Sequence, residues 1–265
     1  MKERGTSGPD AGPRLADRLT AARRARFVGR GSEIALFAQA LIGRMPPFAV
    51  LHVVGPGGIG KTTLLQEYAD MAQRAGRPVV RLDARGLAPE PEYVLAALAQ
   101  AMGAHGAAAG SLAARCPRDA VLLIDTIDGL GALDGWWRDV FLPQLPAHVV
   151  VVLAGRHAPP PAWFTDVQWA PLTRMVALRN LPPDESHSYL TLRGVAPHRH
   201  AQVLSLTCGH PLALSLLADA CAHSDADDDL DLQHAPDMVR TLLHKLLDEV
   251  PSVQHRLALD ACAIV

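Results

Sequence analysis

The stretch Val50-Leu-His-Val-Val-Gly-Pro-Gly-Gly-Ile-Gly-Lys-Thr-Thr-Leu64 decides the fold, because it joins an apolar run, a glycine-rich turn and the start of a helical pattern. Gly55, four further residues and then Gly60-Lys61-Thr62 fit the pattern G-x-x-x-x-G-K-[ST] of a phosphate-binding loop. In such a loop the backbone N–H groups surround a phosphate, and glycines keep Cβ atoms out of the way. The stretch therefore predicts a buried strand, an anion-binding loop and a helix that begins near Lys61.

The residues of this loop have distinct expected roles. Lys61 is expected to bridge the β- and γ-phosphates of a nucleotide, and the hydroxyl of Thr62 to hold Mg²⁺. Unpaired N–H groups at the start of the next helix point at the same anion. A glycine turn without a ligand is the alternative, but the flanking strand and helix favour phosphate binding. Backbone freedom is expected from Gly57, Gly58 and Gly60, and the predicted nucleotide contacts are Pro56, Gly57, Gly58, Ile59, Gly60, Lys61, Thr62 and Thr63.

Composition limits the classes of protein that the chain can belong to. Its 265 residues, 49% hydrophobic and 20% charged, are enough for one substantial domain and a smaller one. The net charge of −2 gives no electrostatic case for binding nucleic acid. No apolar run approaches the roughly 18 residues of a membrane span, so a cytoplasmic protein is expected. The cysteines are far apart and show no C-x-x-C, which predicts reduced thiols: Cys116, Cys208, Cys221 and Cys262.

A second stretch, Ala120-Val-Leu-Leu-Ile-Asp125, is a continuous apolar run that ends in a carboxylate. This pattern predicts a central parallel strand with an acid at its carboxyl edge, where open α/β sheets bind ligands. Asp125 is therefore the candidate Walker B residue, which holds Mg²⁺ directly or through water. Asp128 follows three residues later, and one interpretation is that it caps a helix that runs into Gly129 and Leu130.

The stretch His148-Val-Val-Val-Val-Leu-Ala-Gly-Arg156 predicts another buried strand, which ends in an arginine. A positive charge at the carboxyl edge of a central strand is unfavourable unless it meets an anion. Arg156 is therefore expected to sense the γ-phosphate or the group around Asp125. A solvated arginine in a loop is the alternative.

The remaining periodicities complete an α/β fold, in which helices on both faces of a parallel sheet make three layers. Further strands are expected at 77–83 and 175–178, and helices at 61–74 and 91–102. Trp136, Trp137, Phe141 and Leu145 have the spacing of a helix face packed on the sheet. After Leu181 the pattern is helical throughout, with helices at 186–194, at 198–208 and from Gly209 onward.

The N-terminal region is predicted to be a flexible basic arm over residues 1–26. Within it, 13–26 is expected to form a short helix that either contacts nucleic acid or an acidic partner or is a solvated face. A second helix is expected over 35–42, with Ser32 as its N-cap and an apolar stripe of Ile34, Phe37 and Leu41. The arginines of the arm are Arg14, Arg18, Arg23, Arg24 and Arg26.

Three segments together resemble the nucleotide-binding domains of AAA+ ATPases and of their STAND class, the signal-transduction ATPases with numerous domains. Phe27-Val-Gly-Arg-Gly-Ser-Glu-Ile34 is similar to their opening segment F-V-G-R-E-x-E-[LI], except for Gly31. Asp125-Thr-Ile-Asp128 resembles a D-T-[FY]-E variant of Walker B in some bacterial members. Gly209-His210-Pro211 resembles the G-x-P motif of their helical lid, usually G-[HN]-P-L-A-L.

The resemblance implies roles for further residues. Phe27 and Val28 would pack against adenine, with Gly29 and Arg30 beside the nucleotide. Asp128 would replace the glutamate that activates water, and because aspartate is one methylene shorter, hydrolysis is expected to be slow. An arginine like Arg156 often ends this strand in STAND domains.

The resemblance also gives the lid and the domain organisation their expected functions. His210 and Pro211 would lie near the adenine or ribose, so that the position of the lid depends on the bound nucleotide. The implied domains are 27–180 for nucleotide binding, 181–232 for the lid and 233–265 for the truncated start of a winged helix, with sensor or effector domains missing beyond it. The implied ligands are ATP or ADP with Mg²⁺, and self-association follows ATP binding.

Three functions are compatible with these residues. The first is a nucleotide-gated switch with slow ATP hydrolysis. The second is a non-hydrolysing scaffold that keeps ADP as a structural ligand. The third is a DNA-associated regulatory AAA+ ATPase, which would use the arginine arm.

Overall fold

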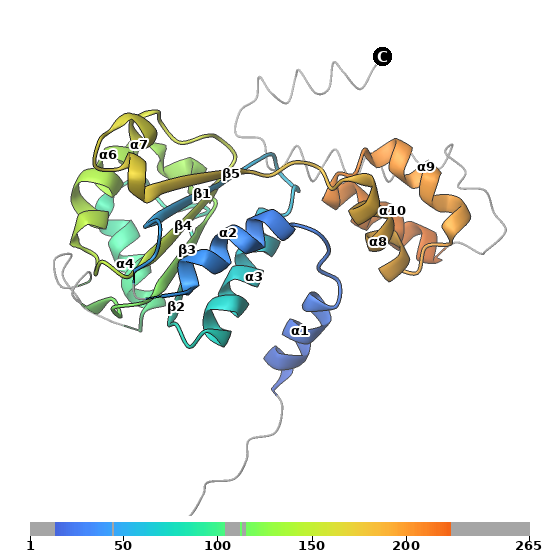
Figure 1. The fold of residues 1–265 in the computed structure, drawn as a ribbon, viewed down its shortest axis with the longest axis horizontal. Coiled ribbons are helices and arrows are strands. Elements are labelled where there is room, and N and C mark those ends of the chain that lie inside the picture. The colour runs from blue at the N-terminus through green and yellow to red at the C-terminus, as the bar shows by residue number, and fades with distance from the viewer. Residues whose placement is uncertain (1–13, 44, 104–111, 113–114, 224–265) are drawn as a thin grey trace, which may run out of the picture.

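A parallel β-sheet forms the centre of the larger part of the protein (Figure 1). The computed structural model describes residues 14–43, 45–103, 112 and 115–223. Within these residues the sheet has five strands in the order β2-β3-β4-β1-β5, and every neighbouring pair is parallel. All carboxyl ends therefore meet at one edge, where parallel sheets bind ligands. The strands are β1 (Val50–Val54), β2 (Val79–Asp83), β3 (Val121–Asp125), β4 (Val150–Gly155) and β5 (Thr173–Ala177).

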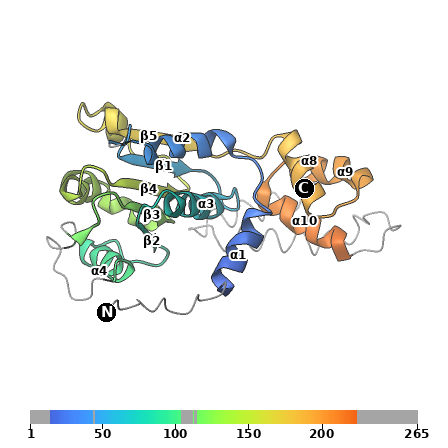
Figure 2. The ribbon, with the colours of Figure 1, turned by 60° about the horizontal axis from the view of Figure 1, so that its bottom comes forward.

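The sheet is apolar on both faces because helices cover both of them. β1 and β4 are buried at every position, which explains their continuous runs of valine and leucine. On one face, side chains from α2 (Gly31–Leu41) and α3 (Lys61–Arg74) pack on the strands, and Phe37 stacks on Tyr68 with ring centroids 4.1 Å apart. On the other face, α4 (Pro91–Ala101) packs with the segments that follow β3 (Figure 2). The predicted three-layer α/β architecture is confirmed.

The segment after β3 is not the regular helix that its aromatic spacing predicts. It runs through a 3₁₀ helix, the short α6 (Asp134–Trp136), a π-helical turn and a second 3₁₀ turn that ends at Gln144. Gly129, Gly131 and Gly135 lower the helical propensity of this stretch. Trp137 and Phe141 are nevertheless buried in the core, as their spacing predicts. The short helix α7 (Ala162–Thr165) follows β4 and adds the buried Trp163.

The first described helix, α1 (Leu15–Arg24), is anchored on α3 by two arginines. The guanidinium groups of Arg23 and Arg24 lie 3.0 and 3.1 Å from one carboxylate oxygen of Asp70, which is buried. The predicted basic helix is therefore present, and part of its charge is neutralised within the protein. No helix in the described part of the chain is long and apolar enough to cross a membrane.

Ser32 is not the N-cap of the helix that contains it. α2 begins at Gly31, so Ser32 lies inside its first turn and its hydroxyl donates to Glu33 at 2.6 Å. Arg30 is the residue before the helix, and its φ of 64° is left-handed. The prediction failed because this turn depends on the contacts of the Arg30 side chain, which a local pattern does not reveal. The expected stripe of Ile34, Phe37 and Leu41 does face the core.

Three helices form the lid after β5: α8 (Pro183–Leu192), α9 (Pro197–Thr207) and α10 (Pro211–His223). They pack around their own small core, which includes the fully buried Leu190, Val203 and Leu214. The backbone N–H of Leu181 donates to Gly209 at 2.9 Å and joins the start of the lid to its last turn before α10. The expected remainder of the lid to 232 and the expected winged-helix start at 233–265 lie outside the described residues.

Arg77 links three segments at the amino edge of the sheet. Its guanidinium donates to the carbonyl oxygens of Ala40 at 2.7 Å, Asp119 at 2.7 Å and His148 at 2.5 Å. These carbonyls end α2 and precede β3 and β4. One half-buried side chain therefore satisfies three backbone acceptors.

Replacing Arg77 with Met is expected to lower the free energy of unfolding by about 1.5–3 kcal/mol, because three acceptors lose a charged donor. Urea denaturation followed by circular dichroism measures the change. Arg81→Met is the matched control, since Arg81 is an exposed arginine in the adjoining strand, and its effect should stay within about 0.5 kcal/mol. Equal losses in the two variants would show that the three bonds of Arg77 contribute nothing specific.

Candidate nucleotide-binding cleft

The glycine-rich loop connects β1 to α3 at the carboxyl edge of the sheet. Gly58 and Gly60 have left-handed φ angles of 69° and 99°, which side chains strongly disfavour. Gly57 has no positive φ, so the left-handed turns of the loop lie at Gly58 and Gly60. The loop ends at Lys61, the first residue of α3, as the sequence predicts. The unpaired N–H groups of this helix start therefore lie beside the loop.

Lys61 folds back over the loop. Its ammonium group donates to the carbonyl oxygens of Gly55 at 2.6 Å and Pro56 at 2.9 Å. This position places a positive charge next to the N-terminus of α3, where the helix dipole also favours an anion. Both features suit a phosphate group.

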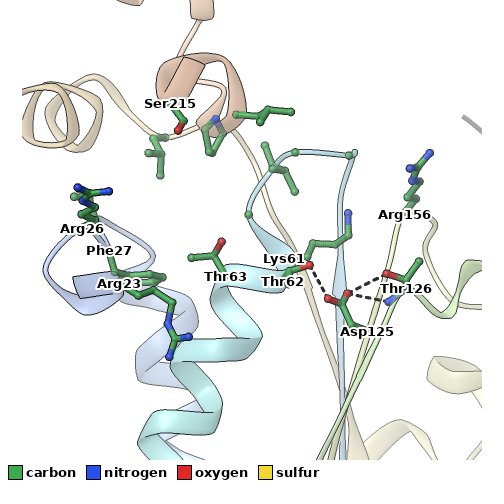
Figure 3. A pocket seen from close by; sticks show the side chains of 18 of the residues that line it. Arg23, Arg26, Phe27, Lys61, Thr62, Thr63, Asp125, Thr126, Arg156 and Ser215 are labelled. Carbon is green, nitrogen blue, oxygen red and sulfur yellow. Dashed lines mark hydrogen bonds between the residues drawn. The ribbon is translucent and has the colours of Figure 1, made fainter. Parts of the chain in front are cut away.

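Thr62 and Asp125 meet although they are far apart in the sequence. The hydroxyl of Thr62 donates to a carboxylate oxygen of Asp125 at 2.6 Å, and the other oxygen accepts the N–H of Thr126 at 2.8 Å (Figure 3). Hydroxyl and carboxylate oxygens are the ligands that Mg²⁺ prefers. Thr62 and Asp125, the two predicted metal-binding residues, therefore form one cluster of oxygen atoms at the end of the loop. These oxygens fit Mg²⁺.

Thr126 has an unusual backbone conformation that the sequence does not signal. Its φ of 57° is left-handed, which is rare and costly for a β-branched residue. The hydrogen bond from its N–H to Asp125 holds it there and turns the chain away at the end of β3. Thr126 also lines the cleft.

Asp128 does not cap the following helix. One carboxylate oxygen accepts the backbone N–H of Arg156 at 2.5 Å, so Asp128 joins the ends of β3 and β4. The same oxygen lies 3.4 Å from His157, whose side chain is exposed. The interpretation of Asp128 as a helix cap is therefore wrong, because its carboxylate oxygen accepts a hydrogen bond from the residue that follows β4. Asp128 and Arg156 both line the cleft, as Thr62 and Asp125 do.

Phe27 and Val28 line the other end of the cleft, where α1 leads into the domain. Figure 3 shows Phe27 and Arg26 on one side of Thr63, with Asp125 and Arg156 on the opposite side. The structure places the predicted base contacts and the predicted metal ligands at opposite ends of one cleft.

Gly29 and Arg30, which are expected beside the nucleotide, follow two lining residues but do not themselves line the cleft. Arg30 is buried and donates to the carbonyl oxygen of Ile59 at 2.9 Å, so it supports the loop from outside the cleft. Its guanidinium is also 3.5 Å from the carboxylate of Glu33. Gly29 lies against the carboxylate of Glu185 in α8, and its left-handed φ of 76° favours glycine at this position. Both residues therefore shape the surroundings of the loop.

The lid contacts the loop directly. His210 lies with its Nε2 3.2 Å from the carbonyl oxygen of Gly57 and does not itself line the cleft. Burial lowers the pKa of His210, whereas the hydrogen bond to Gly57 opposes that change. The neutral imidazole must therefore carry its proton on Nε2 to donate to the carbonyl. A Cβ atom on Gly58 would lie only 2.8 Å from Leu212, so this glycine also permits the close approach of α10.

The cleft enclosed by these elements has a volume of about 720 Å³. It has walls from the loop, the Asp125 cluster, the segment around Phe27 and the lid, which contributes Pro211. Some of its residues have no local sequence signal, because the fold brings them there from separate elements. These missed residues are Arg23, Arg26, Arg85, Thr126, Leu181, Tyr189, Leu212 and Ser215.

Fold and cleft together define a P-loop nucleotide-binding protein of the AAA+ type. The family model described as AAA ATPase domain matches residues 26–193, and the chain belongs to this family. No curated protein sequence matches the chain significantly.

Solved structures with the same fold come from proteins of low sequence identity. Orc1 of Aeropyrum pernix, in complex with DNA, has a TM-score of 0.56 and 18% identity, over 86% of this chain and 72% of that chain. Cdc6p from Pyrobaculum aerophilum has a TM-score of 0.53 and 14% identity, over 91% and 70%. The RuvB Holliday junction branch migration motor of Thermotoga maritima has a TM-score of 0.50 and 16% identity, over 82% and 70%. At these identities the similarity shows the fold.

Lys61→Ala is expected to weaken ADP binding by about tenfold to more than a hundredfold, because it removes a charge-assisted contact to phosphate. Isothermal titration calorimetry measures the affinity. Arg74→Ala is the matched control: Arg74 is the basic residue at the opposite end of α3, paired with Glu67, and its loss should leave binding unchanged. An unaltered ADP affinity in Lys61→Ala would contradict the assignment of the loop.

Proposed function

We propose that this protein is an ATP- and ADP-binding molecular switch of the STAND type, with slow, Mg²⁺-dependent ATP hydrolysis. The observation that carries the proposal is the direct contact of the lid with the phosphate-binding loop, through His210 and Gly57. Because Pro211 lines the same cleft as Lys61, a bound nucleotide would touch the sheet domain and the lid together. The position of the lid would then report which nucleotide is present. Because the chain resembles STAND ATPases, the proposal also includes self-association in the ATP-bound state.

The residues predicted from the sequence that line the cleft each have a part in this function. Lys61 and the N–H groups at the start of α3 bind the phosphates, and Thr62 and Asp125 would hold Mg²⁺. When bound there, Mg²⁺ would supply neutralisation of the negative charge on the phosphates. Asp128 orients water near the terminal phosphate, and Arg156 senses that phosphate. Phe27 and Val28 pack against the base.

Slow turnover is supported by the environment of Asp128. One of its oxygens is engaged by the N–H of Arg156, and its side chain is one methylene shorter than a glutamate. A general base must come within hydrogen-bond reach of the attacking water. The competing function, a scaffold that holds ADP without hydrolysis, corresponds to an Asp128 that never achieves this geometry.

Substitutions of Asp125 and of Asp128 are expected to have different effects. Asp125→Ala should remove the Mg²⁺ dependence of ATP binding, whereas Asp128→Asn should leave binding unchanged and lower only phosphate release. Asparagine keeps an acceptor for the N–H of Arg156, so the second variant tests the charge and not the strand link. ATP titrations with and without Mg²⁺, together with a phosphate-release assay, measure both. No phosphate release by the unmodified protein would favour the scaffold, and equal loss of ATP binding in both variants would contradict the division of roles.

The described residues do not favour the third function, DNA-associated regulation. Orc1 is in complex with DNA in its structure, and RuvB is named as a Holliday junction motor. In this protein, Arg23 and Arg24 of the arm pair with Asp70, and Arg26 lines the nucleotide cleft. Asp70 therefore neutralises part of the positive charge of the arm, which weakens the basic surface that phosphate backbones require.

The switch requires that ligand binding stabilise the sheet domain and the lid together. At a hundred times its dissociation constant, ADP adds about 2.7 kcal/mol to the stability of the folded state. For a chain of this size the melting temperature should rise by about 5–10 °C. Pro211→Ala is expected to reduce this ADP-dependent rise while the loop still binds phosphate, because the substitution removes a lid contact.

Differential scanning calorimetry with and without ADP measures the effect of Pro211→Ala. Pro197→Ala is the matched control, since Pro197 occupies the same first position of its helix, α9, and does not line the cleft. Loss of a helix-starting proline should lower the melting temperature of both variants without ligand. If the ADP-dependent rise is as large in Pro211→Ala as in the unmodified protein, the lid does not report the nucleotide through this residue.

A further inference from the structure

A second cavity lies next to the nucleotide cleft, and Asp128 lines both. Its volume is about 190 Å³, and it lies between the segment that follows β3 and the connection from β4 to α7. Its walls include His52 of β1, Asp134, Trp137 and Trp163. The proposed switch does not use this cavity.

The polar side of the cavity carries negative charge. Asp128 and Asp134 line it, and no lysine or arginine is among the described residues that do so. One oxygen of Asp134 accepts the indole N–H of Trp163 at 2.6 Å, and one oxygen of Asp128 accepts the N–H of Arg156. Each carboxylate retains a second oxygen that can accept further hydrogen bonds. The other titratable side chains among the described residues of the lining are the exposed His157, 3.4 Å from Asp128, and the buried His52.

His52 adds a buried ring nitrogen without a described partner to this lining. Its side chain is only 2% exposed, and its Nε2 has no hydrogen-bond partner within the part of the chain that the structure describes. Its ring meets Trp163 edge-on, with centroids 4.8 Å apart. Burial lowers the pKa of His52 to about 4, so the imidazole is neutral near pH 7 and can accept a hydrogen bond. A buried polar atom without a partner is costly, and a ligand that donates to it removes that cost.

The rest of the lining is apolar and aromatic. The indoles of Trp137 and Trp163 and the rings of Pro159 and Pro160 contribute to it. Indole rings attract cations through their π-faces, most strongly where water is excluded. A cavity of about 150 Å³ accommodates benzene, so the space here suits a ligand with one ring.

We propose that this cavity binds a small organic ammonium ion, such as an arylalkyl amine, which donates hydrogen bonds to Asp134 and Asp128 and packs its apolar part against Trp137 and Trp163. Aromatic walls, two carboxylates and the absence of lysine and arginine from the described lining suit a cation better than an anion or a neutral molecule. A hydrogen bond to a charged partner is about twice as strong as one between neutral groups. The ammonium is therefore the group that gives the site its selectivity.

Benzylamine and benzyl alcohol form a matched pair of probes, because they have nearly the same shape and differ in charge at neutral pH. Calorimetric titration of the full chain without nucleotide keeps this test independent of the proposed switch. Benzylamine is expected to bind about tenfold more tightly than benzyl alcohol. Equal affinities would reduce the site to an apolar cavity and overturn the proposal, as would the absence of binding by either compound.

Asp134→Asn tests the charge with the least structural change, because the asparagine oxygen still accepts the N–H of Trp163. This variant should lose most of the tenfold preference for benzylamine. Asp139→Asn is the matched control: the same charge is removed five residues away, from an exposed side chain that pairs with Arg138 outside the cavity. If Asp134→Asn and Asp139→Asn lose the preference for benzylamine equally, net charge alone attracts the amine, which would contradict a specific site.

His52→Leu removes the buried acceptor while keeping an apolar side chain in its place. It is expected to weaken benzylamine binding by about threefold and to leave the affinity for nucleotide unchanged. His148→Leu is the control, because Nδ1 of His148 is also buried without a partner but His148 does not line this cavity. If both variants bind benzylamine as the unmodified protein does, His52 has no part in the site.

Discussion

The hydrogen bond between Thr62 and Asp125 is the contact on which the arrangement of the cleft depends. The two residues follow from β1 and β3, which are not neighbours in the sheet because β4 lies between them. The bond therefore spans a strand and joins the loop to the carboxyl edge of the sheet. It is possible only because all strands are parallel, so that every strand ends at the same edge. Asp128 and Arg156 add a second link at this edge, between β3 and β4.

The phosphate-binding loop is held from two sides as well as by its own glycines. Arg30 supports it from α2, at the carbonyl of Ile59, and His210 reaches it from the lid, at the carbonyl of Gly57. Both are side chains from other elements that bond to backbone oxygens of the loop. The conformation of the loop is thus shared between the sheet domain and the lid. A displacement of Arg30 or of His210 would therefore change the conformation of the loop at the phosphate site.

Much of this arrangement can be predicted from local sequence. The loop motif and the apolar runs identify β1, β3, β4 and the start of α3, because a buried parallel strand and a glycine-rich loop have strong local patterns. The residue pair Thr62 and Asp125 follows from the same motifs. Their meeting follows from the rule that parallel strands end at one edge.

Other features depend on contacts between distant segments and have no local pattern. The motif around Arg30 is typical of a nucleotide contact. In the structure its guanidinium lies on the outside of the loop, where it donates to the carbonyl oxygen of Ile59 and pairs with Glu33. Asp128 looks like a helix cap, but its oxygen bonds to Arg156, 28 residues later. Thr126 adopts a left-handed angle that its residue type disfavours. The aromatic spacing around Trp137 predicts burial correctly but not the irregular helix that achieves it.

The four tryptophans of the chain have an uneven distribution that affects how the protein can be observed. Trp136, Trp137, Trp163 and Trp169 all belong to the sheet domain, where they cluster with ring centroids 5.0 Å apart for the first pair and 5.2 Å for the second. The lid helices contain none. Tryptophan fluorescence is therefore an optical signal from the sheet domain alone, and following the lid by fluorescence at these wavelengths requires a label attached there. Cys208, exposed at the end of α9, offers a thiol for such a label.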